Sequence, residues 1–426
     1  MPCPDRLAQW SKEVSTAFSH LSKPQVWGLI LWSTGIVLSG AAGITQISAL
    51  LALVLEQREQ TVFQRLREWY LDAKHKSGKK RRELDVTSCF APLLRWIVHL
   101  WGNGNHKMVL VLDATTLSDR WTILSISVVI RSCSIPVAWK VLGGHEKGSW
   151  RPHWEELLAA LKGSIPADWH MLVMADRGLY ARWLFQAICA CGWHPFLRIN
   201  LGVKARLVGN ETFDWIGRWA STPGTWWKGK VECFAGKASR LTCTLLMHWE
   251  QGYEYAWAIL TDLAPEEAEV SWYHMRTWVE TGYKDSKRGL WGWHHSKMLS
   301  ASRIERLWLA IAVAQVWSVS VGCLAEAEQQ ELYEQELPPQ HIARRRRKQP
   351  ADQPAPRRLS CVVRGRLGLV AALFTAQCLP CGRLVPQGWP ETITAPRKLP
   401  RPSERRRRER KREYKRRVRA RTRAAA

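Results

Sequence analysis

Four residues of one short stretch combine a phenol, a guanidinium, a carboxylate and an ammonium group: Tyr273, Arg276, Glu280 and Lys287. Arg276, Glu280 and Lys287 follow Tyr273 by 3, 7 and 14 residues. An α-helix turns about 100° per residue, so this spacing predicts four side chains within an arc of about 60° on one helix face. Such a face can bind a metal ion and phosphate groups. The alternative is a solvated charged face, because Arg276 and Glu280 also form an ordinary i,i+4 pair.

Two aspartates upstream follow short apolar runs. Residues 109–112 stop at Asp113 and residues 171–175 stop at Asp176, which predicts two buried strands that end in a carboxylate. If the strands are neighbours and end at the same edge of a sheet, the two aspartates lie side by side. Each aspartate alone also fits a turn or a helix cap. Together with Glu280 they supply oxygen ligands of the kind that Mg²⁺ prefers, and a carboxylate-bridged pair of ions can clamp an in-line phosphoryl transfer.

The elements around the two aspartates alternate in type. Apolar alternation and β-branched content predict strands, and apolar residues at helical spacing predict helices, in the order β-β-β-α-β-α-β. This order predicts a mixed α/β layer structure. The predicted strands are residues 109–112, 121–130, 136–142, 171–175 and 195–199, and the predicted helices are residues 150–161 and 179–191.

These motifs resemble those of the D-D-E transposases of the insertion-sequence-four family. Tyr273, Arg276, Glu280 and Lys287 match that family's Tyr-x2-Arg-x3-Glu-x6-Lys signature, which carries its third acid. The first acid of the family closes a strand, as in the run Asp-Ala-Thr-Thr at 113–116, and the second opens an Asp-Arg motif, as at residues 176–177. A following aromatic-aliphatic-Arg strand corresponds to residues 196–198. The chain departs from the family at residues 178–179, where many members have a more polar run, so the role of Tyr180 stays open.

The resemblance spans residues 105–325 and implies an RNase H-like mixed sheet with flanking helices, interrupted by a β-rich insertion. It implies that Asp113, Asp176 and Glu280 are the catalytic residues and the ligands of Mg²⁺, with Mn²⁺ as a possible substitute. It also implies that the cations of the signature and of the neighbouring motifs bind DNA; these are Arg276 and Lys287 with the phenol of Tyr273, and Arg177 and Arg198.

Residues 26–55 carry no charge and are long enough to span a membrane. Glycines and small polar residues interrupt this run, and residues 40–43, Gly-Ala-Ala-Gly, divide it into two short segments. The second segment precedes a Gln/Glu-rich turn and the amphipathic stretch 61–70, which carries Arg65 and Arg67. This is a helix–turn–helix pattern, so we favour a buried helical DNA-binding domain, with Arg65 and Arg67 on DNA, over a membrane span.

Residues 201–263 contain short β-like runs separated by turn signals, which predicts a small antiparallel sheet inserted into the core. Trp226 and Trp227 lie beside two lysines near one of these turns. Aromatic rings next to cations suit stacking on the bases of an unpaired strand. In the family that the chain resembles, a tryptophan of the insertion stacks on a base flipped out at the transposon end. The alternative is that both tryptophans are packing residues.

The 426 residues carry a formal net charge of +26, which indicates a polyanionic partner. Residues 401–423 contain fourteen Arg or Lys and three Glu, typical of a disordered tail that attracts phosphates without reading sequence. The eleven cysteines have irregular spacing, as expected for reduced thiols in the cytoplasm. The predicted regions are a helical DNA-binding domain (1–82), a connector (83–105), the first part of the core (106–200), the insertion (201–263), the second part of the core (264–325) and a basic, largely disordered region (326–426).

The expected function is that of a transposase that binds the terminal inverted repeats of its own insertion sequence. It would cut DNA strands and join them to a target in metal-dependent reactions. Its partner would be double-stranded DNA, bound by a homodimer at the bacterial nucleoid in the cytoplasm, with no membrane involved. Two alternatives remain at this point: a catalytically inactive, transposase-derived DNA-binding protein, and a membrane-associated nuclease.

Overall fold

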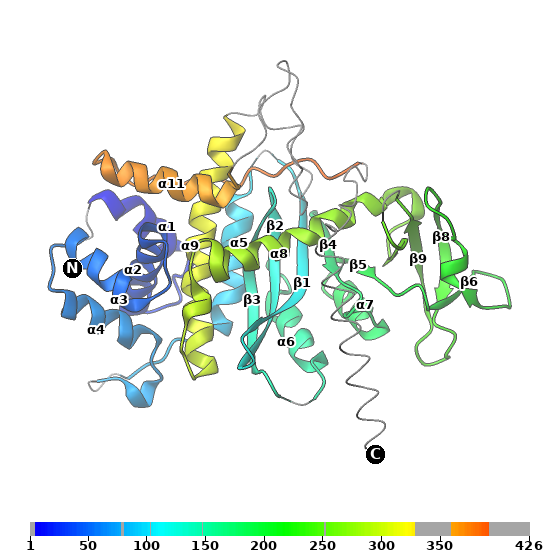
Figure 1. Ribbon diagram of the computed structural model, residues 1–426, viewed down its shortest axis with the longest axis horizontal. Coiled ribbons are helices and arrows are strands. Elements are labelled where there is room, and N and C mark those ends of the chain that lie inside the picture. Colours follow the sequence, from blue (N-terminus) through cyan, green and yellow to red (C-terminus); the bar gives the residue numbers. More distant parts are fainter. Residues whose placement is uncertain are drawn as a thin grey trace, which may run out of the picture.

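The computed structural model describes residues 5–77, 81–102, 104–146, 148–250, 253–328 and 359–391. These residues form a mixed α/β structure with ten α-helices and a single ten-stranded mixed sheet (Figure 1). The basic run 401–423 lies outside the described residues, as does a second run of Arg and Lys at 344–348. The helices are α1 Ala8–Ala17, α2 Lys23–Ser39, α3 Ile44–Val54, α4 Glu59–Tyr70, α5 Phe90–Leu100, α6 Arg151–Leu161, α7 Arg182–Cys189, α8 Trp278–Lys284, α9 Ala301–Ala327 and α11 Cys361–Phe374.

The sheet has the strand order β3-β2-β1-β4-β5-β10-β9-β8-β6-β7. β1 pairs with β4 in parallel and β4 with β5 in parallel, and all other neighbours are antiparallel. The strands are β1 Lys107–Leu117, β2 Trp121–Ile130, β3 Cys133–Gly143, β4 His170–Ala175, β5 His194–Arg198, β6 Lys204–Leu207, β7 Asp214–Trp215, β8 Trp226–Cys233, β9 Leu241–His248 and β10 Trp257–Thr261.

The predicted order of elements from β1 to β5 is confirmed, but the predicted end of β1 is wrong. β1 does not stop at Asp113; it continues to Leu117, because its second half pairs with β2. The connector predicted at residues 83–105 contains α5, which packs on the sheet, with the rings of Phe90 and Trp139 4.8 Å apart.

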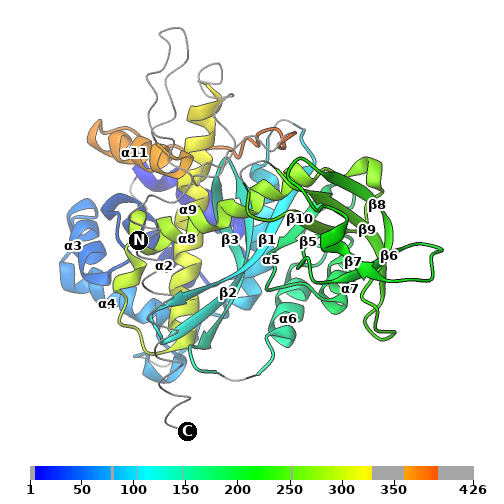
Figure 2. The ribbon, with the colours of Figure 1, turned by 45° about the vertical axis from the view of Figure 1, so that its right-hand side comes forward.

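The insertion does not form a separate sheet. Its strands are antiparallel as predicted, but β10 pairs with β5, with Ile259 opposite Arg198 and Leu260 opposite Leu197. The insertion strands therefore extend the core sheet outward, as Figure 2 shows from the side of β6 to β9. Backbone hydrogen bonds thus join the insertion directly to the strand that carries Arg198.

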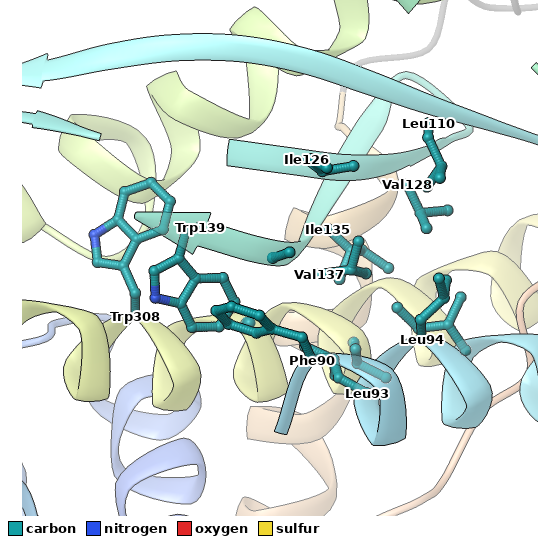
Figure 3. Packing of buried hydrophobic residues seen from close by; sticks show 14 of the residues in the cluster. Phe90, Leu93, Leu94, Leu110, Ile126, Val128, Ile135, Val137, Trp139 and Trp308 are labelled. Atoms are coloured by element: carbon teal, nitrogen blue, oxygen red, sulfur yellow. The ribbon is translucent and has the colours of Figure 1, made fainter. Parts of the chain in front are cut away.

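Each face of the sheet has its own cover. One face packs against α5 and α9, where Phe90, Leu93 and Leu94 meet Val137 and Trp139 (Figure 3). The other face is covered by a 3-10 helical segment, Val270–Thr277, and by α8. Side chains alternate between the faces along a strand, so residues of odd number in β1 and of even number in β4 face this second cover. Val109, Val111, Leu172 and Met174 do so, and Asp113 and Asp176 continue the same two series.

α8 crosses β3, β2 and β1 in close contact with the sheet. Gly282 makes the approach possible, since a Cβ atom at this position would collide with the side chain of Ser134. The first residues of α8 bury Trp278 and Val279 against the sheet. α8 continues into a π-helical turn, Asp285–Gly289.

The N-terminal helices pack on α9 and share one hydrophobic core with the sheet. Arg306 of α9 fixes this junction: its Nη1 donates to the carbonyl oxygen of Tyr70 and to Asp72 Oδ1, both at 2.8 Å. α2 and α3 are separated at Gly40, whose φ of +66° suits glycine. The predicted division at residues 40–43 is therefore confirmed.

Two apolar regions fit a membrane span by length and composition. Among the described residues, α9 is the one single helix that is long and apolar enough to cross a membrane, and 89% of its most apolar segment is buried inside the protein. α2 and α3 are long and apolar enough only when they are taken together, and the two helices meet at a bend of 97°. The side chains of α2 are largely buried, with Trp32 donating to the carbonyl oxygen of Leu66 in α4.

The predicted lack of structure after residue 325 does not hold for residues 359–391. α11 packs on α9 and α2, with Cys361 Sγ 3.5 Å from Cys323 Sγ and Arg366 Nε donating to the carbonyl oxygen of Val37. Residues 379–391, here named the C-terminal strap, then cross one end of the sheet (orange-red in Figure 1). The strap is held where Leu384 pairs with Trp101, and where Ser271 Oγ donates to the carbonyl oxygen of Pro390.

Candidate active site

Asp113 and Asp176 are brought together by the parallel pairing of β1 and β4. The last paired residues are Leu112 and Ala175, so the two aspartates are the next residues on adjacent strands. Each has one carboxylate oxygen fixed by a nearby backbone N–H. Ala114 donates to Asp113 Oδ1 at 2.9 Å, and Gly178 donates to Asp176 Oδ1 at 2.8 Å.

The other carboxylate oxygens face Arg276. Its Nη2 lies 3.0 Å from Asp113 Oδ2 and 3.7 Å from Asp176 Oδ2, and its Nη1 lies 2.7 Å from Glu280 Oε1. The three predicted acids, from two strands and one helix, thus surround a single guanidinium. The side chains of Arg276 and Asp113 are 11% and 17% exposed, whereas those of Asp176 and Glu280 are about half exposed. The cluster is therefore buried at Asp113 and Arg276, here called its floor, and open to solvent at Asp176 and Glu280.

Burial and charge act in opposite directions at this floor. Burial raises the pKa of the Asp113 carboxyl, and the Arg276 guanidinium lowers it in part. Burial alone would lower the pKa of Arg276, but Asp113 and the other two carboxylates outweigh burial and raise it. Within the cluster itself, one guanidinium therefore faces three carboxylates.

The four signature residues do not lie on one α-helix. Tyr273 and Arg276 lie on the 3-10 segment, Glu280 on α8 and Lys287 on the π-helical turn. In a 3-10 helix, residues i and i+3 are eclipsed, so Tyr273 and Arg276 still share one face. Arg276 and Glu280 remain within contact distance. Lys287 is half-buried, and no ion pair joins it to the three acids among the described residues.

Tyr273 and Arg198 lie next to Asp176. The Tyr273 hydroxyl donates to the carbonyl oxygen of Ala175 at 3.1 Å, and burial raises its pKa above the usual value. The guanidinium of Arg198 lies 5.6 Å from the ring centre of Trp257 and 5.9 Å from that of Tyr273. These cation–π contacts hold Arg198 on the same face of the sheet as the acids.

Among the remaining predicted DNA-binding residues, one lies beside an acid and the others lie on β8 and α4. Arg177 is exposed beside Asp176. Trp226 is 65% exposed at the start of β8, whereas Trp227 packs edge-on against Trp219. On α4, Arg67 is exposed and Arg65 donates to Gln57 Oε1 at 3.1 Å.

Two residues of the site were not anticipated from the sequence. Tyr283 is partly buried, and its hydroxyl bonds both Ser125 Oγ and the carbonyl oxygen of Asp113. The only signal in the sequence is its position three residues after Glu280, which places both on neighbouring turns of one helix. Trp257, which supports Arg198, gave no signal of its own.

Three carboxylates around one guanidinium are oxygen donors of the type that a hard divalent cation prefers. As the side chains stand, the described residues include no group of three or more His, Cys, Asp or Glu that could hold a metal ion. The guanidinium of Arg276 lies between the three carboxylates. The residues therefore fit Mg²⁺ by their chemistry, provided that Arg276 leaves this position.

Comparison with known proteins adds no relative: no protein-family model matches the chain, and no curated protein is significantly similar to it.

Proposed function

We propose that this chain is a DNA transposase of the insertion-sequence-four type, which cuts the terminal inverted repeats of its own element and joins them to target DNA. The observation that carries this proposal is that Asp113, Asp176 and Glu280, from three different elements, surround one guanidinium. A single pair of acids would fit many enzymes. Three acids around one guanidinium, with Asp176 and Glu280 about half exposed, supply the carboxylates that metal-dependent phosphoryl transfer uses.

The topology of the first five strands supports the same proposal. The order β3-β2-β1-β4-β5, with β2 antiparallel to β1 and β4 parallel to it, is the arrangement that an RNase H-like core would have. The element order around it matches the family that the sequence resembles. The chain would act on double-stranded DNA as a homodimer at the bacterial nucleoid.

In this proposal Asp113, Asp176 and Glu280 hold Mg²⁺, with Mn²⁺ as a substitute. A metal ion held there would supply Lewis-acid stabilisation of the reacting phosphate and of the attacking oxygen. The residues of the chain position the DNA: Arg198, held by Trp257 and Tyr273, and the exposed Arg177 lie next to Asp176, where they can bind phosphates on either side of the scissile bond. Trp226 offers its exposed ring to an unpaired base.

The test uses the DNA that flanks the gene. Purified full-length protein is incubated with Mg²⁺ and a duplex that ends in the flanking inverted repeat, and strand cleavage and joining are read on denaturing gels. We expect cleavage at the end of the repeat and strand transfer into a second duplex. Specific binding without cleavage would favour the inactive DNA-binding alternative. Recovery of the expressed protein in the membrane fraction would favour a membrane-associated nuclease.

A further inference from the structure

The acid cluster is already neutralised in part by a cation of the chain itself. Arg276 contacts all three acids through its two terminal nitrogens, and two of these contacts are at 2.7 and 3.0 Å. A planar guanidinium with several donors can bridge three carboxylates in this way, whereas a point-like ammonium cannot. Arg276 therefore keeps three repelling carboxylates together without any metal.

The same geometry makes Arg276 a competitor of the metal. A divalent cation bound by Asp113 Oδ2, Asp176 Oδ2 and Glu280 Oε1 would occupy the point that the guanidinium now fills. Two cations this close repel each other strongly in a site with a buried floor. Metal binding and the present position of Arg276 exclude each other.

We propose that Arg276 is an internal counter-ion that a divalent cation must displace, and that DNA phosphate accepts the displaced guanidinium. This inference rests on the proposed function, because it assumes that the three acids bind a metal. It assigns Arg276 two alternative partners, carboxylates without metal and phosphate with metal. Arg276 is then a positioning residue that couples metal binding to DNA binding.

Two observations indicate that the guanidinium can leave the carboxylates and bind a phosphate instead. Its Nε is buried and has no hydrogen-bond partner in the described part of the chain, so it retains a free donor for an incoming oxygen atom. Two of its three carboxylate partners, Asp176 and Glu280, are about half exposed, so these contacts are held weakly. An oligonucleotide phosphate can satisfy the free donor and replace the lost carboxylates.

The coupling has a measurable consequence. If phosphate stabilises the displaced guanidinium, DNA raises the affinity for metal, and metal raises the affinity for DNA by the same factor. Without DNA, the metal must first break the contacts of Arg276 and binds weakly. A variant without the guanidinium has no such contacts to break, so its metal affinity should be higher and should not depend on DNA.

The experiment is a Mn²⁺ titration of full-length protein, with free Mn²⁺ read by electron paramagnetic resonance, with and without a short duplex oligonucleotide. Asp113→Asn protein defines binding at other sites and to the duplex. For Arg276→Gln we expect Mn²⁺ affinity without DNA to rise by about tenfold or more, as the loss of charge-assisted contacts implies, with no further gain from DNA. Arg276→Lys keeps the charge but cannot bridge three acids. Its Mn²⁺ affinity without DNA should therefore lie between that of wild type and that of Arg276→Gln.

Arg206→Gln is the matched control. Arg206 forms another half-buried ion pair, with its Nε 2.6 Å from Glu232 Oε2, in the sheet extension. This variant should bind Mn²⁺ as the wild type does, and thermal unfolding of each variant monitors folding. If Mn²⁺ binding depends on Asp113 but Arg276→Gln binds no more tightly than wild type, the counter-ion role is wrong and the metal site stands. If no Mn²⁺ binding depends on Asp113, the proposed function fails with it.

Discussion

The hydroxyl of Tyr283 lies 3.1 Å from the main-chain carbonyl oxygen of Asp113 and 2.7 Å from Ser125 Oγ. Asp113 and Ser125 are paired residues of β1 and β2, so one phenol from α8 bonds both strands at the level of the acid cluster. This contact fixes the helix that carries Glu280 against the strand that carries Asp113.

Replacing Tyr283 with Phe should therefore misplace two acids relative to each other. We expect the free energy of unfolding to fall by about 1–2 kcal/mol, because a buried bonding group loses its partner. Strand cleavage should fall more than end binding does. Tyr255→Phe is the matched control, since that phenol is half exposed and bonds Glu254. A Tyr283→Phe protein with unchanged cleavage would contradict the positioning role.

Replacing single acids should separate chemistry from binding. Asp113→Asn, Asp176→Asn and Glu280→Gln should each abolish cleavage and joining while binding to the inverted repeat stays nearly intact, because an amide is a poor ligand for Mg²⁺. Asp176 and Glu280 are about half exposed, so their replacements should change the free energy of unfolding by less than about 1 kcal/mol. Gel-shift and cleavage assays on one substrate check this. Wild-type cleavage by the Asp176→Asn protein would overturn the assignment.

The two neighbouring tryptophans should respond in opposite ways. Trp226 is exposed, so Trp226→Ala should leave stability nearly unchanged and weaken binding to an unpaired strand by roughly 1–3 kcal/mol per stacked base. Trp227 packs on Trp219 at 4.9 Å between ring centres, so Trp227→Ala should lower the unfolding free energy by about 3 kcal/mol. Fluorescence anisotropy with a labelled single strand and thermal melts measure the two effects. Equal loss of DNA binding in a folded Trp227→Ala protein would leave the two roles unseparated and refute the assignment to Trp226.

Arg65 and Arg67 test the N-terminal region more cleanly than a deletion does. Removing residues 1–82 would expose the face of α9 that packs on α2, since both belong to one core. Arg67→Ala and Arg65→Ala change only side chains of α4 outside that core. We expect both to reduce the preference for the inverted repeat over random DNA, by about 1–3 kcal/mol if they contact bases. Competition gel shifts measure this ratio. A uniform loss on both DNAs would instead indicate phosphate contacts.

Asp285 should make stability depend on pH. Its side chain is 8% exposed, its Oδ2 has no hydrogen-bond partner among the described residues, and burial raises its pKa to about 6. A carboxyl whose pKa is higher in the folded state stabilises the fold below its unfolded value, about 4, and loses this contribution as pH rises through the folded value.

The stability of wild type relative to Asp285→Asn should therefore fall as the pH rises from about 4 to 7, by an amount on the order of 2–3 kcal/mol. Denaturant unfolding of both proteins across this range measures the difference. Parallel pH curves for the two proteins would show that the Asp285 carboxyl is not the source.

The sequence was most informative where a local pattern matches a local structure. The alternation of residues 121–130 predicted β2 with the bounds that the structure has, and the Gly-Ala-Ala-Gly run predicted the break between α2 and α3. The end of β1 was wrong because the partner of its second half, β2, is a long-range property that no local pattern contains. Its apolar run ends where the pairing with β4 ends, not where the strand ends.

The candidate site followed a similar rule. The types and spacing of the acids and of Arg276 predicted that they belong to one site, but they did not predict the partners of Arg276. The sequence suggested a phosphate as its contact, and the structure has three carboxylates there. The change from a 3-10 to an α and then a π turn also removed Lys287 from the common face, since each type of turn advances by a different angle.

The C-terminal strap sets an order of events for a chain that is still being made. The ribosome releases the N-terminal helices, the sheet and all three acids before it releases residues 379–391. Until then the β2–β3 turn lacks Gln387, which accepts a hydrogen bond from the backbone N–H of Arg131 at 2.7 Å, and the start of the 3-10 segment lacks Pro390. A message truncated before the strap would therefore yield a chain that contains every acid but lacks the contact of Ser271 with Pro390 at the start of the segment that carries Arg276.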